Sequence, residues 1–453
     1  MRFNIGSAAL VLAAVALGSA GAQAQTIPNL PVLRGLAPVS TLLDTKVGKA
    51  ALAANLRITG AIQVGALKQP ILLPFPAQQQ QSLRDAFITD WNAAELADGL
   101  GTTLGPVYQA AARYETPDKS TSVSPAIANL IAYTNQTTGR DSGAGKYFFA
   151  NGTTDKTTPV SPEAAAILAA VHGVTDVFGK AYGFKAGSAG ANPYGNSRPF
   201  QTEPHLALFT GHDYFGKPSG NAVYLRGPAQ NLTASPSYPS GHTTYGYAES
   251  VLLAILVPER YEQEITRAAE YGNDRIILGA HYAMDVIGGR TLALYDLAHL
   301  LANDPAYVGQ PKPRGTVIKD YPGAVALARA DMTRALQSGC GDVVARCSRL
   351  DHGRFDNIVA NERLVRSTLT YGLPVVHAGT ANMSEDVEKL APEAGHLLTA
   401  AFPYLTLAQA DRILTATEGP GGSFLDDGSS FGVYSRLNLA AAAMKAAALA
   451  PPR

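Results

Sequence analysis

The sequence predicts an all-α protein, a helical bundle with long loops. Apolar residues recur at intervals of three and four in several segments, whereas the alternating pattern of strands is scarce along the 453 residues. The composition is 46% hydrophobic and 16% charged, which is typical of a globular protein with enough apolar side chains for a large core. The elements behind this prediction follow in chain order.

The first 24 residues predict a signal peptide. Arg2 supplies a positive charge, residues 8–17 are apolar, and Ala22-Gln23-Ala24 is a small-x-small cleavage site. An N-terminal membrane anchor is the alternative, but the apolar stretch is short for a membrane span. No later segment approaches the ~18 uninterrupted apolar residues that a span requires. We therefore expect cleavage near Ala24 and a periplasmic or secreted protein with no membrane span.

Helices and long loops are predicted to alternate in the next part of the chain. Residues 25–80 are rich in Pro, Leu and Ala and predict an extended lead-in with one short helix. Residues 82–114 have helical periodicity. The stretch 134–158 contains Gly, Thr, Asn and Asp and predicts a long loop. Ser161 followed by Pro162 predicts the start of another helix.

A further loop is predicted over residues 192–239, which are dense in Pro, Gly, Tyr and Asn. Helices are expected from His242 to about Leu301, and a Pro/Gly/Lys hinge follows. Residues 322–336 and 407–416 predict two of the later helices.

The chain therefore divides into three predicted parts. Residues 1–24 are the signal peptide, residues 25–305 are the helical core with its lead-in, and residues 306–453 are a C-terminal helical extension packed on that core. The motifs that indicate chemistry lie between residues 185 and 285.

The only two cysteines, Cys340 and Cys347, lie seven positions apart. In an exported chain the simplest interpretation is one local disulfide that closes a small loop. Two unpaired thiols are the alternative, and two cysteines alone are weak evidence for a metal site.

The charges of the chain balance, with 36 Lys and Arg against 36 Asp and Glu. No overall field attracts nucleic acid or anionic lipid, so we expect neither partner. Any binding of anions must come from the local placement of Arg and Lys.

A helix start with a histidine is predicted at residues 239–242, Pro-Ser-Gly-His. Pro239 and Gly241 indicate a tight turn, and a nearly all-apolar helix follows. Ser240 and Gly241 then lie at a helix N-terminus, where free N–H groups and the helix dipole favour an anion. His242 stands beside that anion and is placed to give a proton to a leaving group. An ordinary Ser-Gly cap with an incidental histidine is the alternative.

A second histidine has a carboxylate partner. His281 and Asp285 are four residues apart, so on a helix the carboxylate accepts a hydrogen bond from the imidazole and leaves the other nitrogen free to act as a nucleophile. Arg275 lies six residues before His281, on another face of a continuous helix. Gly279 between them is available to break that helix and turn both toward one ligand. The alternative is a structural His–Asp pair with a surface arginine.

Arg198 precedes Pro199 in the predicted loop. The proline biases the arginine toward an extended backbone, and guanidinium groups suit bidentate contact with phosphoryl oxygens. For this residue taken alone, a surface arginine is the simpler interpretation.

These three segments together resemble the signature of the acid phosphatase/vanadium-dependent haloperoxidase superfamily, which includes the type 2 phosphatidic acid phosphatases. That signature reads K-x6-R-P, then P-S-G-H, then S-R-x5-H-x3-D, and the order and spacing here are of that type over roughly residues 160–300. The resemblance implies a helical bundle with the active site at its core.

The resemblance also implies a role for each matching residue. His281 is the nucleophile that attacks phosphorus, Asp285 orients it, and His242 protonates the leaving oxygen. The residues implied to hold the phosphoryl oxygens are Arg198, Ser240, Gly241 and Arg275.

Two positions depart from the signature. The signature lysine falls at position 191, which is Ala191. Lys185 is the nearest lysine upstream and is our candidate replacement, ahead of Lys180 and Lys217. The residue before Arg275 is Asp274 instead of serine, which puts a carboxylate near the predicted anion site.

The leading functional prediction is an exported acid phosphatase that hydrolyses small phosphate monoesters through a phosphohistidine intermediate. It requires no metal or other cofactor, and vanadate would inhibit it. The alternative enzyme is a vanadium-dependent haloperoxidase, in which vanadate would be the cofactor at the same site. A catalytically silent phosphate-binding protein is a third possibility, which a paired nucleophile and acid argue against.

Overall fold

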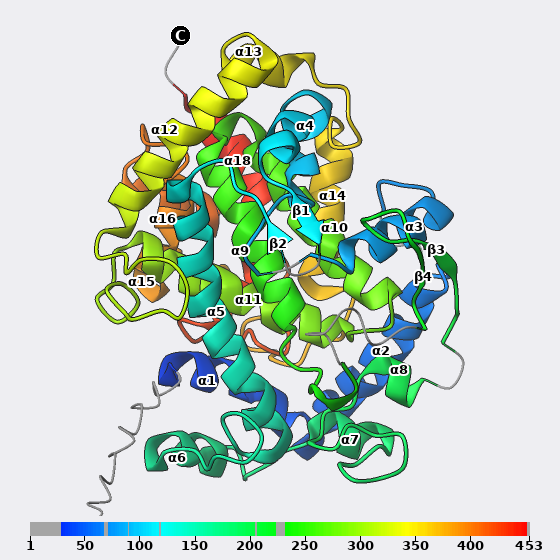
Figure 1. The fold of residues 1–453 in the computed structure, drawn as a ribbon. Coiled ribbons are helices and arrows are strands. Elements are labelled where there is room, and N and C mark those ends of the chain that lie inside the picture. Colours follow the sequence, from blue (N-terminus) through cyan, green and yellow to red (C-terminus); the bar gives the residue numbers. More distant parts are fainter. Residues whose placement is uncertain are drawn as a thin grey trace, which may run out of the picture.

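The computed structural model describes residues 29–67, 71–88, 90–116, 119–203, 206–222 and 232–450. The chain is 59% helix and 3% strand, and these residues form 18 α-helices and two small two-stranded sheets (Figure 1). The prediction of an all-α fold is confirmed. The predicted signal peptide and its cleavage site at Ala24 lie outside the described residues.

Three consecutive helices form the centre of the molecule: α9 (Gly241–Leu256), α10 (Tyr261–Ile277) and α11 (Ala283–Leu301). Figure 1 shows them in green at the middle of the bundle, and α9 packs against both α10 and α11. Nearly all of their side chains are buried, including several charged residues of α10. The motifs from Ser240 to Asp285 therefore belong to the most buried part of the protein.

Helix α5 (Pro125–Asn151) packs along α9, α11 and α12, and it corrects the prediction of a loop over residues 134–158 as far as Asn151, whereas residues 152–158 contain no helix. Several of its hydroxyl groups bond to carbonyl oxygens of the helix itself. The hydroxyl groups of Thr134 and Thr137 donate to carbonyl oxygens one turn earlier, at 2.8 and 2.9 Å. Tertiary packing thus outweighs the local composition, and the helix ends only at Gly152, which has a left-handed backbone.

Helix α2 (Lys46–Gln63) corrects the prediction that residues 25–80 are mainly an extended lead-in. It begins at a Thr cap and buries one apolar face. Its polar residues have a specific task, because Asn55 and Thr59 accept hydrogen bonds from the N–H groups of Met284 (3.0 Å) and Ala283 (3.2 Å). Helix α2 therefore supports the first turn of α11, whose free N–H groups need acceptors.

The remaining α-helices lie outside these five. They are α1 (Leu30–Leu36), α3 (Phe75–Asp85), α4 (Gly101–Ala111), α6 (Pro162–Ala170), α7 (Val177–Tyr182), α8 (Pro199–Thr202), α12 (Tyr321–Cys340), α13 (Val344–Cys347), α14 (Ile358–Thr370), α15 (Val387–Leu390), α16 (His396–Thr399), α17 (Leu407–Thr415) and α18 (Leu439–Ala448). The 3-10 helices are η1 (Ala37–Asp44), η2 (Leu96–Leu100), η3 (Leu232–Ala234), η4 (Pro258–Arg260), η5 (Ser348–Leu350), η6 (Pro392–Gly395) and η7 (Gly432–Arg436). The predicted helix over 82–114 is interrupted between α3 and η2.

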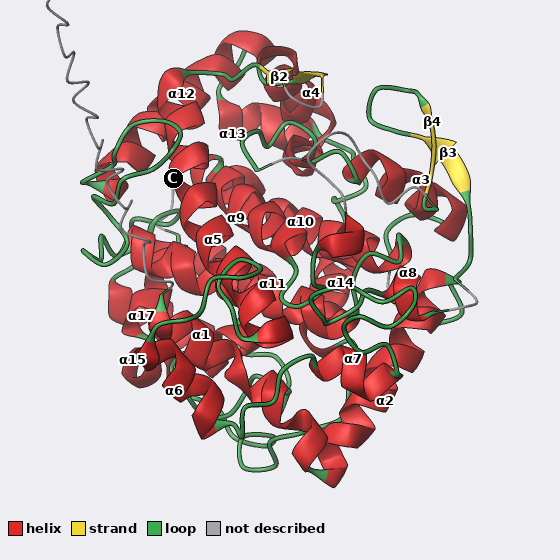
Figure 2. Ribbon diagram, turned by 60° about the horizontal axis from the view of Figure 1, so that its bottom comes forward, coloured by secondary structure: helices red, strands yellow, loops and turns green. Residues whose placement is uncertain are grey.

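The strands form two antiparallel pairs at the periphery, drawn in yellow in Figure 2. They are β1 (Tyr114–Thr116) with β2 (Lys119–Ser120), and β3 (Thr210–His212) with β4 (Pro218–Gly220).

The part of the chain after residue 305 packs on the central helices. Helices α14 and α18 lie against α10. One main hydrophobic core includes side chains from both ends of the described chain, from Val32 to Ala446. The predicted disulfide between Cys340 and Cys347 is present and joins the ends of α12 and α13. Among the described helices, none combines the length and the apolar character needed to cross a membrane.

Candidate active site

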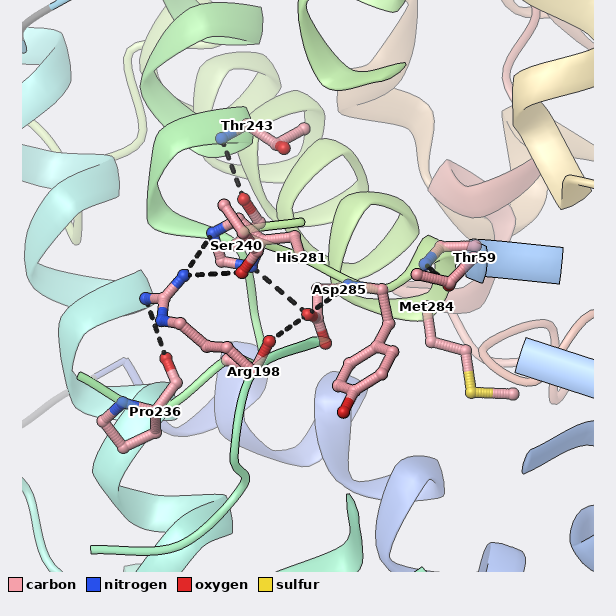
Figure 3. A network of polar contacts seen from close by, with 12 residues as sticks. Thr59, Arg198, Pro236, Ser240, Thr243, His281, Met284 and Asp285 are labelled. Atoms are coloured by element: carbon pink, nitrogen blue, oxygen red, sulfur yellow. Dashed lines mark hydrogen bonds and ion pairs between the residues drawn. The ribbon is translucent and has the colours of Figure 1, made fainter. Parts of the chain in front are cut away.

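The first turn of α9 lies where the sequence predicts it. Ser240 caps the helix, and its Oγ accepts a hydrogen bond from Thr243 N at 3.1 Å (Figure 3). Its backbone N–H is already used, because it donates to the carbonyl of Asp285 at 3.0 Å and so ties α9 to α11. The N–H group of Gly241 lies before the helical hydrogen-bond pattern begins. It is therefore a backbone donor that this helix end offers to an anion.

His281 lies on the connection between α10 and α11, and Gly279 shapes that connection. Gly279 has a φ of +72°, and a Cβ atom there would lie 2.7 Å from a side-chain atom of Leu206. After this turn the N–H groups of Ala280 and His281 both donate to the carbonyl of Arg275, at 3.1 and 3.2 Å. Glycine thus breaks α10 as expected and brings His281 back over the helix end.

The His281–Asp285 pair forms, but not on one helix face as the spacing suggested. His281 precedes the cap of α11, whereas Asp285 lies in its first turn. Asp285 Oδ2 accepts from Tyr282 N at 2.8 Å and from His281 Nδ1 at 3.2 Å. The carboxylate therefore holds the start of α11 and the imidazole with the same oxygen.

The contacts of His281 define its tautomer. Arg198 Nη1 lies 3.0 Å from His281 Nε2 (Figure 3). Because a guanidinium only donates hydrogen bonds, Nε2 must accept and the ring proton is on Nδ1. Burial, reinforced by the charges of Arg198, Lys146, His242 and Arg275, holds the pKa of His281 well below its usual value. The side chain is thus a neutral imidazole with its lone pair on Nε2.

Arg198 reaches inward from a loop, as expected for an arginine before proline. It is fully buried and caps α8 with an extended backbone. Its other donors have neutral acceptors: the carbonyls of Ser235 (2.8 Å), Ala280 (2.9 Å) and Pro236 (3.3 Å), and Ser235 Oγ (3.1 Å). All five N–H groups of this guanidinium therefore have partners, and the contact with His281 is the one that a ligand would exchange. Burial lowers the pKa of Arg198 to about 10.

Arg275 differs from Arg198 in one decisive respect. It lies in the last turn of α10 with no exposed surface, and none of its three nitrogens has a hydrogen-bond partner among the described residues. Its guanidinium carbon lies 5.8 Å from the centre of the Tyr271 ring. Buried polar groups normally have partners, so this guanidinium is prepared for a ligand with acceptor oxygens.

Asp274 does not disturb this arrangement. Its Oδ1 accepts from Gln78 Nε2 at 2.7 Å, on α3. Burial, together with the neighbouring carboxylates Asp85 and Glu270, raises the pKa of Asp274 well above its usual value. The position that departs from the family signature thus holds a carboxyl group that faces α3, and its surroundings favour the neutral form, which does not compensate the charge of Arg275.

The side chains of His242 and His281 lie close together. Their ring centres are 5.8 Å apart, and the His242 ring lies 5.5 Å from that of Tyr245. The side chain of His242 is 9% exposed, whereas His281 is fully buried. The predicted acid therefore lies on the solvent side of the predicted nucleophile.

Lys185 is not part of the site, which corrects the prediction that it replaces the signature lysine. It is exposed on the loop that follows α7. The long connection before Arg198 folds as an excursion over the surface, so it does not carry Lys185 inward.

Two residues at the site were missed by sequence reasoning. Ser237 donates a hydrogen bond to Asp285 Oδ2, and Lys146 of α5 donates from Nζ to the carbonyl of Pro236 at 3.0 Å. Ser237 lies close to the Pro-Ser-Gly-His segment, and proximity in sequence is the only signal that indicates it. Lys146 had no usable signal, because its helix was interpreted as a loop.

Asp285 is the carboxylate at the site that opposes the positive charge of these cations. Burial raises the pKa of Asp285 to about 6, against the opposing effects of the Ser237 hydroxyl, the Tyr282 N–H group and the charges of Arg198 and Lys146. Within the described residues, His, Cys, Asp and Glu side chains form no group of three or more that is suited to a metal ion. The site is therefore rich in positive charge and hydrogen-bond donors, which fits an oxyanion.

Comparison with known proteins identifies the central part of the chain. Residues 165–303 match the sequence model of the PAP2 superfamily. These residues form a PAP2 superfamily domain. It contains both histidines, both arginines and Asp285, whereas Lys146 precedes it.

Relatives of the PAP2 domain are acid phosphatases by name. The non-specific acid phosphatase of Salmonella typhimurium is 41% identical over 69 residues, which are 15% of this chain and 28% of that protein. The acid phosphatase of Zymomonas mobilis is 38% identical over 115 residues, 21% of this chain and 44% of the relative. The non-specific acid phosphatase of Providencia stuartii is 38% identical over 72 residues, 16% and 29%. The chain thus covers less than half of the length of each of these relatives.

Proposed function

We propose that this chain is an exported acid phosphatase that hydrolyses small phosphate monoesters through a phosphohistidine intermediate. One observation carries the proposal: the buried Arg275 has unused donors beside a neutral, oriented His281. A guanidinium in this state suits a group with several anionic oxygens. The names of the matched relatives support the same chemistry.

The first chemical step is an attack on phosphorus. His281 Nε2 gives its lone pair to phosphorus while the bond to the leaving oxygen breaks, and His242 transfers a proton to that oxygen. The phosphoryl group takes the place of His281 Nε2 as the acceptor of the Arg198 Nη1 donor. Asp285 stabilises the positive charge that develops on the imidazole, because it already accepts from Nδ1.

The second step releases phosphate. Water attacks phosphorus, His242 takes its proton, and the electron pair of the breaking P–N bond returns to His281. Arg275, Arg198 and the N–H group of Gly241 stabilise the charge on the phosphoryl oxygens in both steps. These groups supply the positive charge, so the proposed mechanism requires no metal ion.

The test is hydrolysis of p-nitrophenyl phosphate with and without vanadate. The wild-type protein should hydrolyse the ester and be inhibited by vanadate, and His281→Ala should lose at least about 10³-fold in kcat/KM. His242→Ala should accumulate a phosphoenzyme that is labile to acid and stable to alkali, as expected for phosphohistidine. Vanadate-dependent peroxidation of bromide without ester hydrolysis would contradict the proposal and favour a haloperoxidase.

The exported location is part of the proposal and rests on the N-terminal sequence pattern and on the disulfide between Cys340 and Cys347. Expression of the full chain in a bacterial host should give a periplasmic or secreted protein that begins at Gln25. Recovery of the uncleaved chain from the cytoplasm would contradict this part alone.

A further inference from the structure

Lys146 reaches the active site from a helix outside the PAP2 domain. It lies on α5, and its Nζ donates to the carbonyl oxygen of Pro236 at 3.0 Å. Arg198 Nη2 donates to the same oxygen at 3.3 Å. One neutral acceptor thus holds two cations side by side. An ammonium group has three donors, so the bond to Pro236 leaves Lys146 further donors for a ligand.

The stem of Lys146 lies against the start of α9. A Cβ atom on Gly241 would lie only 3.3 Å from Lys146 Cε, closer than ordinary van der Waals contact. The glycine of the Pro-Ser-Gly-His segment therefore leaves room for the lysine as well as for an anion. The ammonium group thus lies near the helix end and Arg198, close enough to interact electrostatically with His281 and Asp285.

The electrostatic surroundings of Lys146 suit an anion. Burial and the neighbouring Arg198 guanidinium lower the pKa of Lys146 well below its usual value, and the Asp285 carboxylate opposes them. Lys146 in turn lowers the pKa of His281. Like charges this close repel one another, and a negative group between them offsets that repulsion. A phosphoryl group at the site is such a group, and its binding would favour the charged form of the lysine.

We propose that Lys146 is a phosphoryl-binding residue of this enzyme, supplied by α5 in place of the lysine that the family signature carries before Arg198. The inference rests on the proposed phosphatase function. It explains how the chain tolerates Ala191 at the signature position and an exposed Lys185 nearby. It also assigns a function to α5, a helix that residues 165–303 do not include.

The experiment compares three variants with the wild-type protein. Lys146→Met removes the charge and keeps the aliphatic stem, Lys146→Arg keeps the charge, and Lys185→Met is the matched control on an exposed loop. The measurements are kcat/KM for p-nitrophenyl phosphate, the inhibition constant of inorganic phosphate, and the melting temperature. We expect Lys146→Met to lose about 10²-fold in kcat/KM and to bind phosphate about tenfold more weakly.

The controls separate binding from a structural role. Lys146→Arg should lose less than about tenfold in kcat/KM, because it still donates to oxyanions, and Lys185→Met should match the wild type. A Lys146→Met variant that keeps the wild-type phosphate inhibition constant overturns the inference. If Lys146→Met does not fold, Lys146→Gln takes its place with the same expected outcome.

The failure of this inference is distinguishable from that of the proposed function. If the wild type hydrolyses the ester and Lys146→Met behaves like Lys185→Met, only the role of Lys146 is wrong. If the wild type does not hydrolyse the ester, the phosphatase proposal fails. Calorimetric titration with inorganic phosphate then tests the lysine alone: at least about tenfold weaker binding by Lys146→Met supports its role, and equal binding overturns it.

Discussion

Arg267 and Arg275 lie on the same helix, about two turns apart, and both are fully buried. Arg267 has carboxylates at every nitrogen. It forms a two-pronged pair with Asp85 at 2.7 and 2.7 Å and a contact with Asp98 at 2.6 Å. Arg354 adds a second cation, which binds Asp98 at 2.6 Å and Glu270 at 2.7 Å.

Arg275 has no such partner, and its surroundings are cationic. Lys146, Arg198 and Arg275 all act on His281, whose partner is the carboxylate of Asp285. A buried charge without a partner destabilises the folded state. Two arginines of one helix thus differ: Arg267 holds α3, η2 and α10 together, whereas Arg275 has unused donors, which under the proposed function bind an anion.

The largest effect on activity is expected from Arg275→Met. The substitution removes five unused donors from the site, so kcat/KM for p-nitrophenyl phosphate should fall by about 10³-fold. The melting temperature in phosphate-free buffer should stay the same or rise, because an uncompensated buried charge is lost. Inorganic phosphate should stabilise the wild type more than the variant. A variant that is equally active, or that melts far below the wild type, would show that Arg275 is structural.

Arg267→Met should have the opposite profile. It leaves the buried Asp85 carboxylate without its paired cation and leaves Asp98 and Glu270 with Arg354 alone, so the free energy of unfolding should fall by about 3–5 kcal/mol. Chemical denaturation measures this change, and the activity per folded molecule should change far less than in Arg275→Met. The matched control is Arg346→Met, which breaks an exposed pair with Asp342 and should cost less than about 1 kcal/mol. Equal losses in the free energy of unfolding for Arg267→Met and Arg275→Met would remove the contrast between a paired and an unpaired arginine.

The residues of the candidate active site were largely predictable from the sequence. The sequence places Arg198, His242 and His281 in short segments with recognisable spacing. Each segment forms a single turn or helix end, so its residues stay close together in the fold. Gly279 was also identifiable, since only a break in α10 lets His281 and Arg275 approach one ligand. The chemistry of these groups follows from their types, so a list of candidates was possible without the fold.

Long-range packing was not predictable in the same way. The stretch 134–158 has the composition of a loop, yet it is helical as far as Asn151, because hydroxyl groups bond within the helix while α9, α11 and α12 cover it. Lys146 on that helix is 52 positions from Arg198 (198 − 146), a distance that no local pattern connects. The hydrogen-bonding partners of Arg267 come from two other segments, α3 and η2, and no local pattern in the sequence connects them either.

The smallest effect is expected at Asp274, which lies between the surroundings of Arg267 and those of Arg275. Its pKa is raised well above the ordinary value of 3.8, mainly by burial, so folding takes up a proton wherever the unfolded chain is ionised. Stability from this group is complete below pH 4 and is lost as the pH rises toward the raised folded pKa. Over that window the wild type should lose about 1.4 kcal/mol per pH unit more than Asp274→Asn, whose side chain is always neutral.

Chemical denaturation at several pH values between 4 and the raised folded pKa measures the difference for Asp274→Asn. The amide keeps an oxygen that accepts from Gln78 and gains an N–H group that faces Asp85, so the local contacts remain. The kcat/KM of the variant should stay close to that of the wild type, because a neutral group beside Arg275 replaces another neutral group. If the two stability profiles run parallel with pH, Asp274 is ionised in the folded protein. In that case a carboxylate lies next to Arg275, and the distinction between a paired and an unpaired arginine on α10 is wrong.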